Sequence, residues 1–246
     1  MPASSLIPAL AIGLSLGLLG GGGSILTVPA LVYWAGLPPL EAISSSLVVV
    51  GLTSVSGALQ HARRGHVRLR AALLIAATGL PAAYAGSLLS LRLGERTLMV
   101  LFALLMIAAG LSMLVRRREP EPGEASIPGV LAAGLAVGLI TGFFGVGGGF
   151  LVVPTLVVFA RVPILDAVGT SLAVIAFNCC AGFAGRIAAA GSIHWVATLS
   201  FSAVAIAGSF AGAALAGRLP TDSLRRSFAV FVLGLAVFVI ARNLGG

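Results

Sequence analysis

The residues best suited to chemistry are two glycine clusters embedded in long apolar stretches. Residues 20–29 read GGGGSILTVP, and residues 145–154 read GVGGGFLVVP. Consecutive glycines weaken a helix, and a broken helix in hydrocarbon must turn its free backbone N–H groups toward protein or a polar cavity. The helix that follows each break presents free N–H donors and the positive end of its dipole, so each break predicts an anion site. The plainer alternative is that the glycines serve close helix packing.

The predicted substrate site combines both glycine clusters with polar residues of the next long helix in each half, the one that begins after the proline turn. Ser46 and Thr53 are seven residues apart, as are Ser171 and Asn178, so each pair lies on one helix face. Hydroxyl and amide groups can donate to an oxyanion, although Ser and Thr also bond to their own helix backbone. The predicted substrate-binding residues are Gly22, Gly23, Ser24, Ser45, Ser46, Thr53, Gly147, Gly148, Gly149, Thr170, Ser171 and Asn178.

Two further residues, His61 and Arg186, occupy equivalent positions about one turn before a loop. They are candidates for gating or for recruiting the anion at opposite mouths, while an arginine at a helix end also commonly reaches to the membrane interface. The same helix begins with an acid in each half, Glu41 or Asp166, where the helix dipole stabilises a negative charge. No metal-ligand spacing or nucleophile–base pairing is evident, so we predict no catalytic residues, no metal site and no cofactor.

The elements that must position these residues are transmembrane helices. The chain is 59% hydrophobic and 9% charged, whereas a soluble domain carries about 25% charged residues. A spanning helix needs about 20 apolar residues. Uncharged runs approach or exceed this length, the last only marginally, at 6–35, 42–60, 71–91, 97–115, 127–160, 167–185, 195–217 and 227–241. We therefore predict an all-α polytopic protein of the cell (inner) membrane.

The net charge of +8 comes from 15 arginines without any lysine. The arginines cluster between the apolar runs, where they set membrane topology, so no nucleic-acid partner is predicted. The absence of lysine also excludes a phosphate-binding Walker A loop in this chain.

An internal repeat organises the whole chain. Residues 1–118 form the first repeat, residues 119–126 a charged linker, and residues 127–246 the second repeat. Each repeat contains a glycine-broken helix or re-entrant helical hairpin, a short proline turn and three transmembrane helices. The second of these three helices is rich in small residues that favour close packing in lipid: Gly79, Ala83 and Gly86 in one repeat, Gly208, Gly212 and Gly217 in the other.

The orientation of the repeats depends on whether the broken segment crosses the membrane. A single crossing gives parallel 4+4 helices, with 9 arginines inside and 6 outside. A hairpin inverts the second repeat and puts 11 arginines inside and 4 outside. The positive-inside rule favours inverted repeats.

The paired glycine segments resemble those of a known family. Each ends in Val-Pro and precedes a similar stretch, AISSSL at 42–47 and AVGTSL at 167–172. Together they resemble the sulfite exporter TauE/SafE family of membrane transporters over nearly the whole chain, although SSSL at 44–47 departs from the more typical GTSL. The resemblance implies transport, often export, of a small inorganic or organic sulfur anion such as sulfite, sulfoacetate or thiosulfate.

Two other functional classes stay open at this level. The chain could be a membrane-embedded partner or assembly subunit, or an anion channel without carrier activity. The oligomeric state is not predicted. Apart from Glu41 and Asp166, no acid lies within a predicted span to carry protons or sodium, which favours export without a coupling ion.

Overall fold

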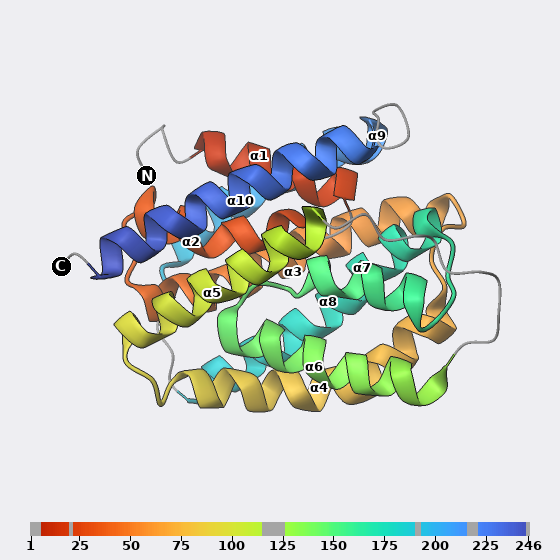
Figure 1. Ribbon diagram of the computed structural model, residues 1–246, viewed down its shortest axis with the longest axis horizontal. Coiled ribbons are helices and arrows are strands. Elements are labelled where there is room, and N and C mark those ends of the chain that lie inside the picture. Colours follow the sequence, from red (N-terminus) through yellow and green to blue (C-terminus); the bar gives the residue numbers. More distant parts are fainter. Residues whose placement is uncertain (1–5, 20–21, 115–125, 190–192, 216–220, 245–246) are drawn as a thin grey trace.

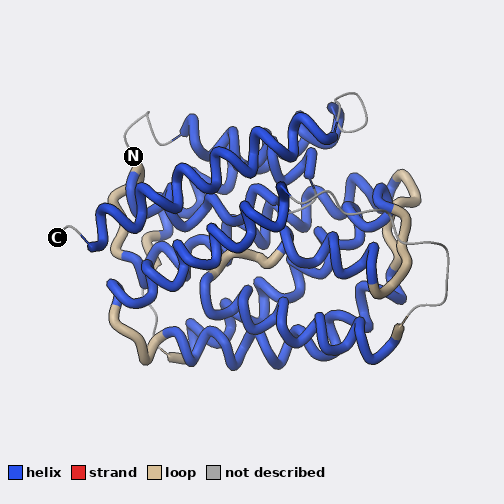
Figure 2. Tube along the Cα trace, viewed as in Figure 1, coloured by secondary structure: helices blue, strands red, loops and turns tan. Residues whose placement is uncertain are grey.

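The computed structural model describes residues 6–19, 22–114, 126–189, 193–215 and 221–244. Every regular element within these ranges is a helix (Figures 1 and 2), which confirms the all-α prediction. The first half contains α1 (Leu6–Leu19), the 3₁₀ helix η2 (Gly22–Leu26), α2 (Thr27–Tyr33), α3 (Pro39–Arg63), α4 (Leu69–Ser90) and α5 (Glu95–Leu114). The second half contains α6 (Ile127–Phe144), α7 (Gly149–Val158), α8 (Ile164–Ala188), α9 (Trp195–Leu215) and α10 (Thr221–Leu244).

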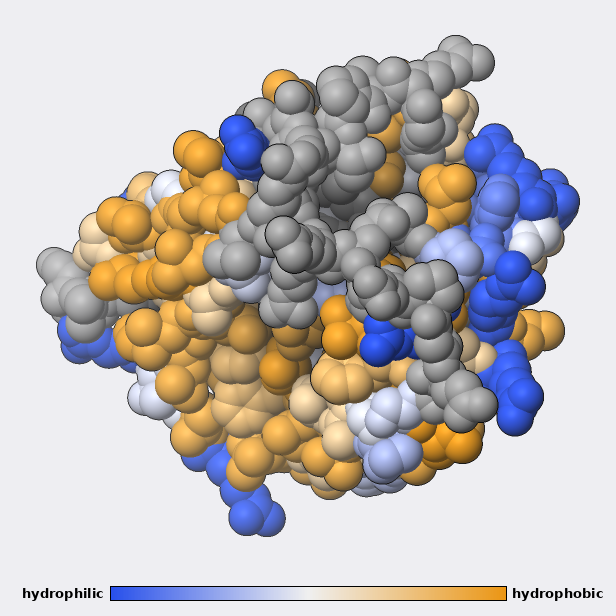
Figure 3. Space-filling model, turned by 45° about the vertical axis from the view of Figure 1, so that its right-hand side comes forward, coloured by the Kyte–Doolittle hydropathy of each residue, from blue (hydrophilic) through white to orange (hydrophobic). Residues whose placement is uncertain are grey.

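Six of the described helices are long and apolar enough to cross a membrane, namely α3, α4, α5, α6, α8 and α9. Shorter apolar stretches lie in α1, in η2 with α2, and in α10. Large hydrophobic side chains are exposed on the outside of the bundle, among them Ile7 at 74%, Val196 at 70% and Leu69 at 65%. Figure 3 shows hydrophobic residues over much of the described surface, with hydrophilic residues gathered toward its edges. A lipid-facing surface has this character, and the protein is a multi-pass membrane protein.

The helix contacts repeat between the halves. Helix α4 packs against α6 and α8, and α9, its counterpart in the predicted repeat, packs against α1 and α3. The remaining large contacts, α3 with α8 and α5 with α10, each join a helix to its own equivalent. The interior is therefore built around α3 and α8, which lie together at the centre of the bundle (Figure 1).

Hydrogen bonds identify two ends of this bundle. At the first end, Arg64 Nη1 donates to the Ala213 carbonyl of α9 over 3.1 Å, and the nearby His66 lies 2.9 Å from Asp166 at the start of α8. We call it the linker end, because α6 begins there after the linker: the Ser126 amide donates over 2.9 Å to the Phe159 carbonyl, which closely precedes the start of α8. At the opposite end, Arg186 Nη2 donates to the Ser90 hydroxyl over 2.7 Å and Nη1 to the Leu40 carbonyl over 3.5 Å.

These contacts fix the directions of the two central helices. Helix α3 starts beside Arg186 and finishes at the linker end, whereas α8 starts at the linker end and finishes beside Leu40. The equivalent helices α3 and α8 therefore run antiparallel, as Figure 1 shows.

Glycines bring the outer helices into backbone contact. A Cβ atom at Gly138 or Gly142 of α6 would overlap the carbonyl of Gly79 or Ala83 on α4. The equivalent pair on α1, Gly13 and Gly17, meets α9 in the same manner. Each pair has the Gly-x-x-x-Gly spacing that lets helices approach closely in lipid. Gly79 and Ala83 on α4 thus meet glycines of α6, and Gly212 on α9 meets Gly17 of α1, whereas Gly217 lies outside the described residues.

Candidate functional site

The second glycine cluster ends one helix and starts another. The α6 helix stops at Phe144, and Gly145 caps it with φ +67° while its amide donates to the Thr141 carbonyl over 2.8 Å. Gly147 and Gly148 also have positive φ, +71° and +65°. Glycine adopts this left-handed backbone without the steric penalty that a side chain brings. Three such residues within four positions reverse the chain, so that α7 begins at Gly149.

The first glycine cluster has a different local shape. The helical segment at this cluster begins as the 3₁₀ helix η2, and α-helical structure starts only at Thr27. The chain here is pressed against α1: a Cβ atom at Gly23 would lie 2.7 Å from the Ile12 carbonyl oxygen and 2.8 Å from Ser15 Cβ. Tight packing on α1 therefore accompanies the 3₁₀ turn.

The two broken segments meet in the middle of the bundle. A Cβ atom at Gly147 would lie 2.5 Å from Val50 Cγ1 on α3, 2.9 Å from Ile175 Cγ2 on α8 and 3.4 Å from Ser24 Cβ on η2. Val50 and Ile175 occupy equivalent positions in the predicted repeat. Gly147 thus lies where equivalent parts of the two central helices face each other, and the fully buried Ser24 adjoins it from the other break. We call the surroundings of Ser24, Gly147 and Gly148 the break junction.

Two buried hydroxyls belong to the broken segments. The Thr141 Oγ1 atom would lie 2.5 Å from a Cβ atom at Gly148. Thr27, the first residue of α2, is also fully buried, and neither hydroxyl has a hydrogen-bond partner within the described residues. Sequence reasoning missed both. Their position in the sequence could have identified them as site candidates, since each threonine lies in an apolar run within seven residues of a glycine cluster.

The predicted polar residues of α3 and α8 have different hydrogen-bond partners and lie in several parts of the bundle. The Ser46 hydroxyl is shared between two carbonyls: it lies 2.6 Å from the Gly145 oxygen, which joins α3 to the second break, and 2.8 Å from the Ile43 oxygen of its own helix. Thr53 and Ser171 donate to their own helices, at the carbonyls of Val49 and Val168, both over 2.7 Å. These bonds within one helix are the alternative that Ser and Thr commonly adopt.

Asn178 and Ser45 carry buried polar atoms without a hydrogen-bond partner in the described part of the chain. Both side-chain atoms of Asn178 are in this state, and they face α4, where a Cβ atom at Gly79 would lie 2.7 Å from Oδ1. An unpaired buried amide is costly, so such a group is expected either to meet a ligand or water, or to change its surroundings during function.

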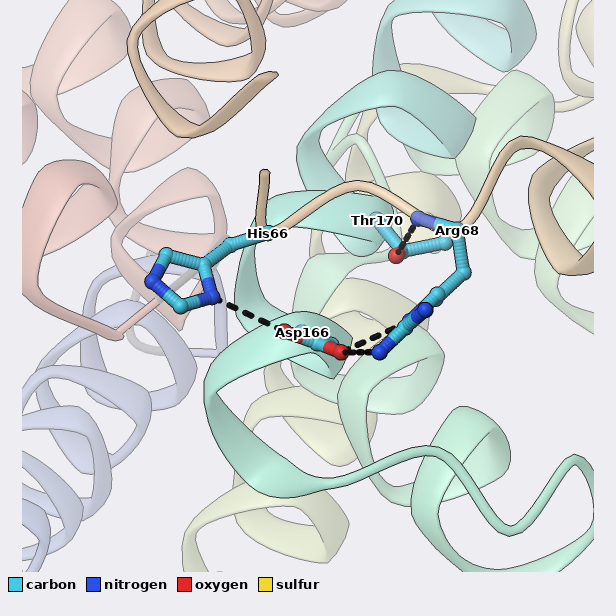
Figure 4. Close-up of polar contacts among 4 residues, drawn as sticks. All are labelled: His66, Arg68, Asp166 and Thr170. Carbon is cyan, nitrogen blue, oxygen red and sulfur yellow. Dashed lines mark hydrogen bonds and ion pairs between the residues drawn. The ribbon is translucent and has the colours of Figure 1, made fainter. Parts of the chain in front are cut away.

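Thr170 lies at the linker end, within a group of polar contacts between the halves (Figure 4). Its hydroxyl accepts a hydrogen bond from the Arg68 amide over 2.9 Å. One carboxylate oxygen of Asp166 lies 2.9 Å from His66 Nδ1, and the other lies 2.6 Å from Arg68 Nη2 and accepts from Nε over 2.7 Å. From the sequence, the Asp166 carboxylate is expected to interact favourably with the dipole of its helix. In the structure the same carboxylate also holds the loop between α3 and α4 against the start of α8. A Cβ atom at Gly169 would overlap the His66 carbonyl, so the loop lies directly on α8.

His61 and Arg186 are both buried, at opposite ends of the bundle. His61 is 6% exposed, and neither ring nitrogen has a hydrogen-bond partner among the described residues. Arg186 is 1% exposed and is held by the Ser90 hydroxyl and the Leu40 carbonyl. An arginine that reached to the membrane interface would expose its guanidinium, so Arg186 does not follow that common behaviour.

Comparison with known proteins agrees with this architecture. The family profile described as "Sulfite exporter TauE/SafE" matches residues 6–239. A "Probable membrane transporter protein" from Xylella fastidiosa (strain Temecula1) is 37% identical, with 94% of this chain and 92% of the relative covered. A protein of the same description from Haemophilus influenzae is 25% identical over 94% of this chain and 95% of the relative. The "Probable membrane transporter protein YunE" of Bacillus subtilis is 25% identical, covering 84% and 85%. No solved structure matches the chain.

Proposed function

Because this chain belongs to the sulfite exporter TauE/SafE family of membrane transporters, we propose that it exports small sulfur-containing oxyanions such as sulfite, sulfoacetate or thiosulfate. The substrate site is the break junction. The observation that carries this proposal is the approach of Ser24, on the first broken segment, to Gly147, on the second, between α3 and α8.

The chemistry of the junction suits an oxyanion. Glycines 147 and 148 leave the backbone bare, so a ligand can approach N–H groups directly. The first N–H groups of α7 have no partner within the helix, and the helix dipole adds partial positive charge at that end. The Thr141 hydroxyl beside Gly148 supplies a further donor. Sulfite or a sulfonate presents several oxygens that accept such hydrogen bonds.

The antiparallel course of α3 and α8 supports inverted repeats around the junction. Two halves of similar structure and opposite direction can exchange conformations, which opens the same central site first to one side and then to the other. With inverted repeats, the sequence assigns 11 arginines to the side of the α3–α4 loop and 4 to the other side. The positive-inside rule then puts the linker end in the cytoplasm and the opposite end outside.

Export of an anion from this arrangement needs no coupling ion. A membrane potential of about 100 mV, negative inside, drives each negative charge outward by about 2.3 kcal/mol. Asp166, one of two acids at the start of a central helix, is already paired with Arg68 and His66. We therefore propose that the membrane potential drives export directly.

Efflux from proteoliposomes tests the function. We expect saturable efflux of sulfite or thiosulfate that increases with an imposed potential, and a several-fold higher KM for Thr141→Val. Thr198→Val is the matched control, because its buried hydroxyl bonds to the His194 carbonyl over 2.9 Å at the start of α9, away from the junction.

Each rival explanation has its own outcome in the same assay. Efflux that requires a proton gradient and ignores the potential would contradict uncoupled export. Flux that rises linearly with concentration would indicate a channel. Absence of flux with every sulfur oxyanion would favour an assembly subunit.

A further inference from the structure

The Arg186 guanidinium lies buried at the opposite end without a countercharge among the described residues. The described part of the chain shows ion pairs of Asp166 with His66 and Arg68, and none with Arg186 within 4.0 Å. We propose that Arg186 is the cationic centre of a second oxyanion subsite, on the exit path between the break junction and the outside. The subsite rests on the proposed function, since its ligand is the exported anion.

The charge of Arg186 is the first step of the argument. Arginine stays protonated in proteins, so it cannot escape the cost of burial by losing its proton. An ion removed from water is tolerated when a partner of opposite charge and further hydrogen bonds compensate. Arg186 is 1% exposed and has only neutral partners, a hydroxyl and a carbonyl, in the described structure. An anion would supply the missing charge.

The hydrogen bonds of Arg186 leave a donor available for that anion. Nη2 donates to the Ser90 hydroxyl over 2.7 Å, and Nη1 lies at the limit of a hydrogen bond, 3.5 Å from the Leu40 carbonyl. Nε has no partner within the described residues. The Ser90 hydroxyl itself donates to the Ser87 carbonyl over 2.8 Å, so it is oriented to accept from the guanidinium. Guanidinium groups bind oxyanions through paired N–H donors, and the free Nε–H is one of them.

The equivalent residue in the first half shows why this subsite favours one end. His61 occupies the position of Arg186 at the linker end and is also buried with unpartnered ring nitrogens. A histidine can be neutral near physiological pH, whereas an arginine keeps its charge. Of these two equivalent buried positions, only Arg186, at the opposite end, therefore offers an anion a permanent positive charge.

Substitution of Arg186 separates this role from a structural one. In purified protein, we expect sulfite and thiosulfate, but not chloride, to raise the Tm of the wild type. Arg186→Met should bind sulfite at least tenfold more weakly, yet its Tm without the anion should equal or exceed that of the wild type, because an uncompensated charge is removed. Arg186→Lys keeps the positive charge but loses the paired N–H donors of the planar guanidinium, so it should bind sulfite with intermediate affinity. Arg92→Gln is the control, since it removes an exposed arginine from the same end.

Two outcomes would overturn the subsite. One is wild-type sulfite affinity in Arg186→Met. The other is a fall in the anion-free Tm of Arg186→Met, or its failure to fold, which would mean that the bonds to Ser90 and Leu40 are structural. Efflux by the wild type distinguishes the two proposals. If the wild type transports sulfite and Arg186→Met matches it in binding and efflux, only the subsite is wrong. If the wild type neither binds nor transports any sulfur oxyanion, the proposed function itself is wrong.

Discussion

The Ser46 hydroxyl donates a 2.6 Å hydrogen bond to the Gly145 carbonyl, which lies 99 residues further along the chain. The donor belongs to α3 of the first half, and the acceptor caps α6 at the second break. Gly145 also lies close enough that a Cβ atom there would be 2.6 Å from Ser46 Oγ and 2.7 Å from the Ile43 carbonyl oxygen. The backbone of one half is thus held at its break by a side chain of the other.

Ser46→Ala should loosen the second break. The Gly145 carbonyl would lose a buried hydrogen bond, which costs about 1–3 kcal/mol. We expect a lower Tm in detergent and slower efflux. Ser112→Ala is the control, because within the described residues the Ser112 hydroxyl bonds to its own helix, at the Ala109 carbonyl over 2.7 Å. Equal effects of the two substitutions would show that the bond between the halves has no special importance.

Gly142→Ala should prevent correct packing of α6 on α4. The added methyl group would overlap the Ala83 carbonyl, and a backbone carbonyl cannot move aside without shifting the helix. Size-exclusion chromatography of the detergent-solubilised protein should show little folded material.

Gly234→Ala is the contrasting variant, because nothing lies within 4 Å of the added methyl group. Alanine is favoured over glycine in a helix by about 0.5–1 kcal/mol, so this variant should fold at least as well as the wild type. Normal folding of Gly142→Ala would contradict the close contact between α4 and α6.

Asp166→Asn should release the loop between α3 and α4 from α8. The substitution removes the charge that pairs with Arg68 and His66 at 2.6 and 2.9 Å. Hydrogen exchange measured by mass spectrometry should become at least several-fold faster in peptides that cover residues 64–68. Glu41→Gln changes the equivalent acid at the opposite end and should leave exchange in this loop unchanged. Unchanged exchange in Asp166→Asn would show that Thr170 and the packing on Gly169 hold the loop without the ion pairs.

Much of the fold could be predicted because glycine and proline interrupt otherwise apolar runs. The predicted starts of the central helices, Glu41 and Asp166, fall within two residues of the starts of α3 and α8. The 3₁₀ helix η2, which precedes Thr27, was not predicted from the sequence. Its 3₁₀ geometry accompanies contact between Gly23 and α1, and the sequence does not reveal which surfaces meet.

The candidate site was less predictable than the fold. Periodicity puts Ser46 and Thr53 on one helix face, and both hydroxyls bond to α3 itself, yet Ser46 in addition reaches across to the second break. Whether a hydroxyl does so depends on what lies within reach after the helices pack. Thr141 was missed because the other polar candidates were recognised as pairs on one helix face, and Thr141 is a single threonine in an apolar helix. The Gly-x-x-x-Gly pairs of α1 and α6 were not predicted either, although their spacing alone could have identified them.

Inverted membrane topology predicts opposite labelling of two equivalent residues. Ala62 is exposed at the linker end, and its equivalent Ile187 is 51% exposed at the opposite end. Cysteine should be introduced at each position separately, after Cys179 and Cys180 have been replaced by alanine. A membrane-impermeant maleimide should label Ile187→Cys in spheroplasts, whereas Ala62→Cys should react only after the membrane has been opened. Labelling of both variants from one side would support parallel repeats, and reversed sides would place the arginine-rich linker end outside against the positive-inside rule.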